Sequence, residues 1–185
     1  MKRTFCLLAA AAAMPWIPMA WAQENPKFDP FAAKNVELTV YLVSGVQTPA
    51  GDDVPQDLAA TVKQLHSLFS YKGYKLAESF ILRGRGSGTG ATNEGVLSGS
   101  GLHYRFAYYK LRLSPEKPYM LHIDSLQFTI SGAASYGTDG KQRNATVASI
   151  STDLDLAEGQ KTVVGKSSIN STDALILVIV PKVIE

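Results

Sequence analysis

Apolar and polar residues alternate with a period of two along much of this 185-residue chain, and this pattern restricts the fold more than any other feature. Successive side chains of a β-strand point to opposite faces, so alternation predicts a strand with one buried face. The first such strand is expected around Val36, Leu38, Val40 and Leu42. Further strands are expected over residues 74–82, 102–113, 119–130, 145–156, 162–164 and 174–180.

The segment 174–180 differs from the others because its apolar, mostly β-branched residues follow one another without a break. An unbroken run of this kind is typical of a strand that is covered on both faces. Pro181 follows it and has no backbone N–H to donate. This end of the strand is therefore expected at a sheet edge, or to lack one ladder bond.

A single helix is expected between the first two strands. Asp53 is predicted to cap it, with Gln56 reaching back as in a capping box and Pro55 in the first turn. Apolar residues then recur at steps of three or four, which predicts one stripe facing a sheet: Val54, Leu58, Val62, Leu65 and Phe69. The predicted fold class is α+β, with one helix packed on a largely antiparallel β-sheet or sandwich of about seven strands.

The N-terminus has the features of a secretory signal peptide. Lys2 and Arg3 precede a short apolar run over residues 5–13, and the small-x-small pattern of residues 20–22 predicts cleavage between Ala22 and Gln23. Residues 1–22 are thus expected to be removed, residues 23–35 to form a flexible lead-in, and residues 36–185 to form a single α+β domain. The expected location is the bacterial periplasm or outer membrane.

Removal of residues 1–22 takes away Cys6, the only cysteine, so the mature chain has no disulfide, thiol nucleophile or thiolate metal ligand. The same segment carries two of the 18 Lys and Arg residues and none of the 16 Asp and Glu residues, which leaves 16 against 16. A balanced chain has no strong field to attract nucleic acid. No later apolar stretch is long enough to predict a helical membrane span.

Glycine-containing segments do not match phosphate-binding motifs. In residues 84–90 glycine stands at every second position, which predicts a flexible hairpin connection and not a dinucleotide-binding turn. Gly159 and the Gly165–Lys166–Ser167 triplet are one residue too far apart for a P-loop. No catalytic, cofactor-binding or metal-binding residue is assigned from these motifs, and no cofactor is expected.

The expected hairpin geometry separates His103 from His122. If residues 102–113 and 119–130 pair about the turn between them, opposed residue numbers sum to about 232, which places His122 opposite Lys110. His103 then lies roughly 23 Å away along the strand, too far to share a metal ion. His122 and Asp124 share a strand face, as do Asp153 and Asp155, but two ligands on a strand do not make a metal site.

Two alternative functions remain open. Tyr104, Phe106 and Tyr108 share one strand face, and their rings suit either stacking on a small ligand such as a carbohydrate or packing in the core. Exposure of these rings in a concave surface would favour ligand binding, and burial would remove it. A hydrolase built on Asp124, Asp153 or Asp155 is the other alternative, with no motif in its favour.

The C-terminal strands resemble those of bacterial outer-membrane secretins. The segment 154–165 contains Gly159, Gln160, Val163, Val164 and Gly165, and it is followed by the apolar segment 174–184. In secretins, a segment like "GQTVVLGG" precedes a terminal strand like "LLIFITPRIV". The chain departs from secretins because only residues 166–174 join the two segments, where a secretin inserts its membrane-crossing hairpin. The resemblance therefore implies a secretin-like strand pair and no self-standing channel.

These features favour a non-enzymatic exported protein that acts as an interaction or assembly module of the cell envelope. The expected partner is another envelope protein, and the secretin-like strands suggest a link to a secretion or pilus system. The tight turn at Glu158–Gly159–Gln160 also has a purely structural interpretation, since Gly159 can adopt positive φ between two strands.

Overall fold

The fold is described by a computed structural model that covers residues 34–49, 51–132, 135–136, 142–143 and 145–184. The expected signal peptide, the cleavage point between Ala22 and Gln23 and nearly all of the lead-in over residues 23–35 lie outside the described residues. All of the long strands expected from the sequence lie within them.

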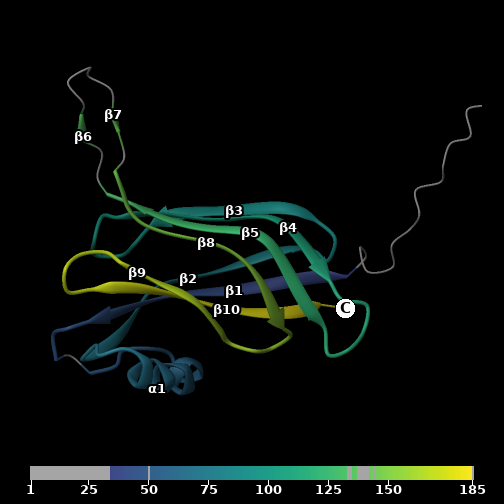
Figure 1. Cartoon of the computed structure of the whole chain (residues 1–185), viewed down its shortest axis with the longest axis horizontal. Helices are drawn as coiled ribbons and strands as arrows, with labels where there is room; N and C mark the ends of the chain where they lie inside the picture. Colours follow the sequence, from purple (N-terminus) through teal and green to yellow (C-terminus); the bar gives the residue numbers. More distant parts are fainter. Residues whose placement is uncertain (1–33, 50, 133–134, 137–141, 144, 185) are drawn as a thin grey trace, which may run out of the picture.

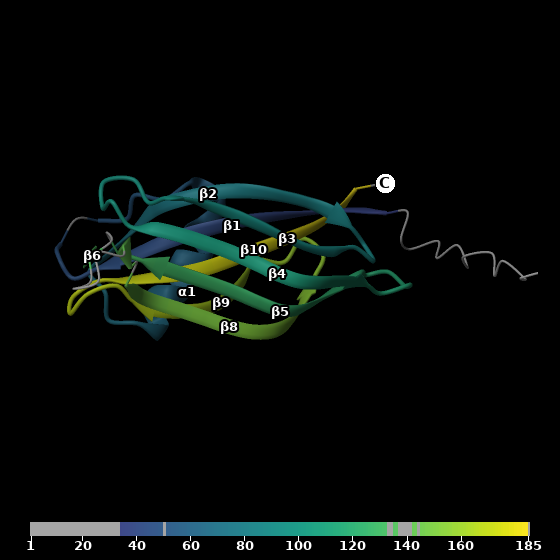
Figure 2. The ribbon, with the colours of Figure 1, turned by 90° about the horizontal axis from the view of Figure 1, so that it is seen from above.

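Eight long strands form two four-stranded antiparallel sheets that lie one above the other (Figure 1). Sheet A has the order β2 (Gly73–Arg85), β1 (Asn35–Val46), β10 (Ala174–Ile184) and β9 (Thr162–Ser168). Sheet B has the order β3 (Thr89–Val96), β4 (His103–Leu113), β5 (Met120–Ser131) and β8 (Thr146–Ala157), which Figure 2 shows from above. The short strands β6 (Ser135–Tyr136) and β7 (Gln142–Arg143) pair separately. The predicted α+β, β-rich fold is confirmed.

The main core lies between the two sheets and is built by the alternating residues. The side chains that β1 directs inward are those predicted from the sequence, Val36, Leu38, Val40 and Leu42. They meet inward-facing residues of β10, β4, β5 and β8, which include Leu177, Phe106, Phe128, Ile130 and Leu156. Burial of apolar surface contributes about 25 cal/mol per Å², so this layer is the main source of stability.

The helix forms a third layer on the opposite face of sheet A (Figure 1). A short 3-10 turn, η1 (Gln56–Leu58), leads into α1 (Ala59–Leu68). The buried stripe of Leu58, Val62 and Leu65 packs on Val43, Tyr74, Ile176 and Val178 of the sheet, as its spacing predicted. Within the described ranges, no helix has the length and apolar character needed to cross a membrane.

Strand β10 lies between the helix layer and the main core. Residues 174–179 are all buried, with Leu175, Leu177 and Ile179 facing sheet B and Ile176 and Val178 facing the helix. The prediction of a strand covered on both faces is confirmed. Pairing with β9 ends at Ile179, so at Pro181 the strand has β1 as its only strand neighbour, and the missing N–H costs no bond to β9.

The predicted capping box is wrong. No side chain caps η1 or α1, because the backbone of Asp53 bridges to β2 instead: its N–H donates to the Tyr74 carbonyl at 2.8 Å and its carbonyl accepts from Leu76 N–H at 3.0 Å. The neighbouring Asp52 carboxylate accepts from Tyr74 N–H at 3.0 Å and lies 2.9 Å from His66 Nε2. Both aspartates tie the helix entry to the sheet.

The predicted hairpin loop over residues 84–90 is also wrong. Strand β2 continues to Arg85 and β3 begins at Thr89, so only three residues connect them, and they pass from sheet A to sheet B. The crossing is held by backbone bonds: Gly86 N–H donates to Lys34, Gly88 N–H to Arg85, and Leu113 N–H to Gly86, at 2.8, 2.9 and 2.8 Å. Strand β3 itself was not predicted.

The turn between β8 and β9 makes a second crossing between the sheets. Gly159 has φ 74°, a conformation that glycine adopts without strain, as the sequence predicted. Its N–H donates to the Pro181 carbonyl at 2.8 Å, and Glu158 N–H donates to the Tyr119 carbonyl at 2.9 Å. These two bonds tie the turn to both sheets.

Candidate interaction surface

The outer face of sheet B is not covered by any described element, whereas α1 covers part of the outer face of sheet A. Along each strand of sheet B, the side chains of this outer face alternate with the core residues, and they form rows across the strands. One row pairs Arg105 of β4 with Thr129 of β5, and the next pairs Ala107 with Gln127. This exposed face is called the outer surface of sheet B below, and it has three distinct regions.

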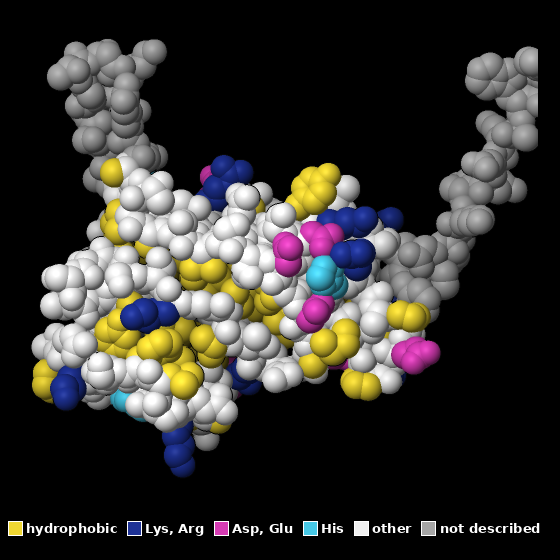
Figure 3. All heavy atoms as spheres, in the orientation of Figure 1, with side chains coloured by type: hydrophobic (Ala, Val, Ile, Leu, Met, Phe, Trp, Pro, Cys, Tyr) yellow, Lys and Arg dark blue, Asp and Glu magenta, His cyan; other side chains and the backbone are white. Residues whose placement is uncertain are grey.

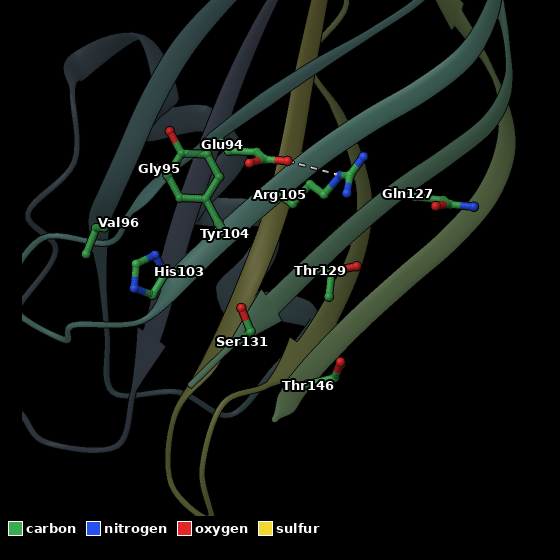
Figure 4. Close-up of a pocket in the computed structure, with 10 residues that line it drawn as sticks. All are labelled: Glu94, Gly95, Val96, His103, Tyr104, Arg105, Gln127, Thr129, Ser131 and Thr146. Carbon is green, nitrogen blue, oxygen red and sulfur yellow. Dashed lines mark ion pairs between the residues drawn. The ribbon is translucent and has the colours of Figure 1, made fainter. Parts of the chain in front are cut away.

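The first region is a groove of about 730 Å³ (Figure 4), and it lies where β3 and β5 end and β8 begins. Its lining side chains, labelled in Figure 4, come from the neighbouring strands β3, β4, β5 and β8. Glu94 of β3 and Arg105 of β4 form an exposed ion pair at 3.3 Å, which contributes little to stability. Other polar side chains that line the groove can form hydrogen bonds: His103, Gln127, Thr129, Ser131 and Thr146. A polar ligand or backbone would find donors and acceptors here.

The second region is a bulge in the middle of the sheet. Both Asp124 and Ser125 face outward between the buried Ile123 and Leu126, so the alternation is interrupted there. Ser125 has φ 51°, the only positive φ of a non-glycine residue in the described part of the chain. Its N–H donates to Asp153 Oδ1 at 2.6 Å, and this bond offsets part of the strain. Bulges of this type turn side chains toward a surface.

The third region is a cluster of charged side chains near the turn between β4 and β5. His122 lies between two carboxylates, with Nδ1 2.5 Å from Asp155 Oδ1 and Nε2 2.7 Å from Asp124 Oδ1. Arg112 donates to the same Asp124 oxygen at 2.9 Å. These residues come from β4, β5 and β8 and are called the charged cluster below. Figure 3 shows acidic and basic side chains gathered around a histidine at this end of the molecule.

The register of the hairpin differs from the prediction and explains the cluster. Opposed residues of β4 and β5 have numbers that sum to 234, so His122 lies opposite Arg112 and not opposite Lys110. On its other side His122 lies opposite Asp155 of β8. His103 pairs with Ser131 at the far end of the same strands and stays remote from the cluster. Sequence reasoning missed Arg112 because the hairpin turn was placed one residue too early.

The cluster shifts the pKa values of two of its members. The hydrogen bond to Asp155 raises the pKa of His122 above its ordinary 6.5, and the charge of Asp155 acts in the same direction against desolvation. Desolvation opposes ionisation of Asp124, but the hydrogen bond and charge of Arg112, together with His122, hold the pKa of Asp124 below its ordinary 3.8. Both shifts favour the charged forms of the two side chains, the imidazolium of His122 and the carboxylate of Asp124.

The pH dependence follows from these directions. Because the folded-state pKa of His122 is raised, its contacts stabilise the fold fully below about pH 6.5 and lose their effect as the pH rises through the raised pKa. The contribution of Asp124 has the opposite sense: it is present above pH 3.8 and is lost as the pH falls through the lowered pKa.

An NMR titration of the His122 ring checks this assignment. We expect Asp155→Asn to lower the pKa of His122 toward its ordinary value, because it removes the largest favourable contact. Asp153→Asn is the matched control, since Asp153 binds the Ser125 N–H and does not contact His122. An unchanged His122 pKa in Asp155→Asn would show that the cluster is not formed in solution.

The three aspartates of the hydrolase alternative are all engaged in structural contacts. Asp124 binds Arg112 and His122, Asp155 binds His122, and Asp153 binds the backbone of Ser125. The fold thus brings Asp124 and Asp155 together on either side of one histidine, which the sequence did not predict. Within the described ranges, no group of three or more His, Cys, Asp or Glu side chains is placed to hold a metal ion.

The aromatic face predicted as a possible ligand platform lies inside the sandwich. Tyr104, Phe106 and Tyr108 are 7%, 0% and 5% exposed, and Phe80 of β2 stacks on Tyr104 with ring centroids 5.4 Å apart. Burial, together with the charge of Glu78, raises the pKa of the Tyr104 phenol. These rings are core residues and are not exposed in a concave surface. The prediction that this face stacks on a small ligand is therefore wrong.

The residues of the secretin-like segment occupy the second crossing and strand β9. Gly159 and Gln160 form the turn, Val163 packs toward the helix side of sheet A, and Val164 packs toward the main core. Gly165 leaves room for Ile150 of β8, since a Cβ at this position would lie 3.2 Å from its Cδ1. Strands β9 and β10 pair directly and antiparallel.

Comparisons with known proteins return no match: no family model fits the chain, and neither the curated proteins nor the solved structures contain a similar one. The likeness to secretins therefore stays a prediction from the residues quoted above.

Proposed function

We propose that this protein is an exported, non-enzymatic interaction module of a bacterial envelope, which binds another envelope protein through the outer surface of sheet B. One observation carries the proposal: this surface runs the length of β4, β5 and β8 without being covered by any described element. It offers a polar groove, a strained bulge and a charged cluster in succession. Interfaces of non-obligate complexes are of this mixed, polar kind.

The envelope part of the proposal rests on the sequence of residues 1–22, with its basic start, short apolar run and small residues at 20 and 22. The class of partner rests on the likeness of residues 154–165 and 174–184 to secretin strands. Secretion and pilus machines are accordingly the assemblies in which the partner is to be sought.

Site-specific photo-crosslinking in intact envelopes tests the proposal. A photoreactive residue replaces Gln127, which is exposed in the groove, or Lys63, which is exposed on the helix surface remote from sheet B. We expect discrete adducts with another envelope protein from position 127 and at least tenfold fewer from position 63. Equal yields at the two positions, or no adduct from position 127, would contradict the proposal. Specific binding of an oligosaccharide in the groove without protein adducts would favour the small-ligand alternative.

A further inference from the structure

Strand β3 is an edge strand whose outer side has no partner strand in the described part of the chain. It pairs only with β4, and β2, which lies on the same side of the sandwich, belongs to the other sheet (Figure 2). An unpaired edge presents backbone donors and acceptors that can template another strand. The proposed function says that this protein binds a partner, and β3 supplies a specific way to do so.

The register identifies the free backbone groups. Just beyond β3, Leu97 N–H donates to the Leu102 carbonyl at 2.8 Å. Hydrogen-bonded and non-hydrogen-bonded pairs alternate along an antiparallel ladder, and pairing is continuous from Ala91 to Val96. Gly95 and Asn93 therefore bond to β4, whereas Thr92, Glu94 and Val96 direct their N–H and carbonyl groups to the free edge.

Strand β3 also lacks the features that normally block an edge. The other edge strands carry several charges or a bulge: Lys75, Arg83 and Arg85 on β2, Asp153 and Asp155 on β8, and Lys166 with a register shift on β9. In β3 the only charge is Glu94, which pairs with Arg105, and there is no proline. Natural sheets use such charges and prolines against unwanted pairing, whereas this eight-residue edge has no proline and a single charge that is paired within the sheet.

The side chains along the free edge of β3 indicate which residues an added partner strand should carry. On the outer surface, Glu94 favours a basic residue directly opposite it, and Val96, which is 50% exposed, favours an apolar residue two positions away.

We infer that the free edge of β3 binds an extended segment of another envelope protein as an added strand of sheet B, with a basic and an apolar residue two positions apart facing Glu94 and Val96. Main-chain hydrogen bonds supply the affinity in this mode, and the alternate side chains supply selectivity. The inference rests on the proposed function and names the place and conformation of the partner.

The test compares Thr92→Pro with Thr92→Ala, each combined with a photoreactive residue at position 96. Proline removes the outward N–H of residue 92 while leaving the bonds to β4, which come from its neighbours, and alanine keeps that N–H. We expect the adduct yield to fall about tenfold in Thr92→Pro and to stay within twofold of the wild-type residue in Thr92→Ala. Equal thermal stability of the two variants shows that β3 remains folded.

A synthetic peptide carrying the crosslinked segment then serves as the probe. N-methylation at alternate residues is expected to weaken its binding about tenfold, and N-methylation at the intervening residues is expected to have little effect, because only alternate amides face β3. Adducts insensitive to Thr92→Pro, or adducts that map to a second copy of this chain, would overturn the inference. Adducts from Gln127 that persist in Thr92→Pro would leave the proposed function standing, so the two failures are distinguishable.

Discussion

Replacement of Phe106 by alanine is expected to lower the free energy of unfolding by about 3–5 kcal/mol. The side chain is 0% exposed at the centre of the sandwich, faces Phe128 across the β4–β5 ladder, and packs edge-on against Phe80 with ring centroids 5.6 Å apart. Two hydrogen-bonded sheets hold the surrounding backbone, so the cavity left by the ring cannot collapse, and the lost contacts add to the lost burial.

Urea unfolding followed by circular dichroism measures this effect. Tyr109→Ala is the matched control, because Tyr109 lies on the same strand with 75% of its surface exposed and its replacement is expected to change stability by less than about 0.5 kcal/mol. If Phe106→Ala unfolds too readily to measure, Phe106→Leu gives a smaller loss of the same sign. Equal stability of the Phe106 and Tyr109 variants would show that the sheets do not pack as described.

Ile176→Ala and Leu177→Ala are each expected to cost about 2–5 kcal/mol, although the two residues point in opposite directions. Both are fully buried on β10, Leu177 in the main core and Ile176 beneath α1. A strand with a solvent-facing side would show a large loss at only one of two consecutive positions. Similar losses at both therefore test the three-layer arrangement directly.

Lys182→Ala is the control for this pair, because Lys182 is exposed on the same strand. Its replacement is expected to change the unfolding free energy by less than about 0.5 kcal/mol. A loss below about 1 kcal/mol in Ile176→Ala would mean that α1 does not cover sheet A in solution. Helix amide exchange in that variant is expected to accelerate before the exchange of sheet B, since the altered contact belongs to the helix layer.

The predictable parts of the fold are those in which burial requires apolar residues at regular, short-range spacings in the sequence. The alternation from Val36 to Leu42, the helical stripe of Leu58, Val62 and Leu65, and the unbroken apolar run of β10 all face the cores that their spacing indicated. Strand β3 left no such signal, because as an edge strand it is held mainly by its ladder to β4 and its composition is polar. Gly90 and Gly95 in its sequence made it resemble a loop.

The charged cluster was not predictable because it depends on register, which short-range patterns do not determine. A difference of two in the sum of opposed residue numbers replaces Lys110 by Arg112 opposite His122. The approach of Asp155 requires β8 to pair with β5, a contact between residues far apart in sequence. A β-bulge likewise turns both Asp124 and Ser125 outward. The residue types do not predict this bulge, because serine is rarely found at positive φ.

The central pair of sheet A joins the two ends of the domain, since Val36 lies opposite Val183 and the ladder continues to Gly45 and Ala174. On its other side β1 pairs with β2, the strand that follows it in the sequence, whereas β10 is the last of the described strands. Pairings that close so large a loop form slowly, and a chain shortened before β10 is expected to stay unfolded. Since β10 supplies buried residues to both cores, a chain that lacks it would leave both of them incomplete.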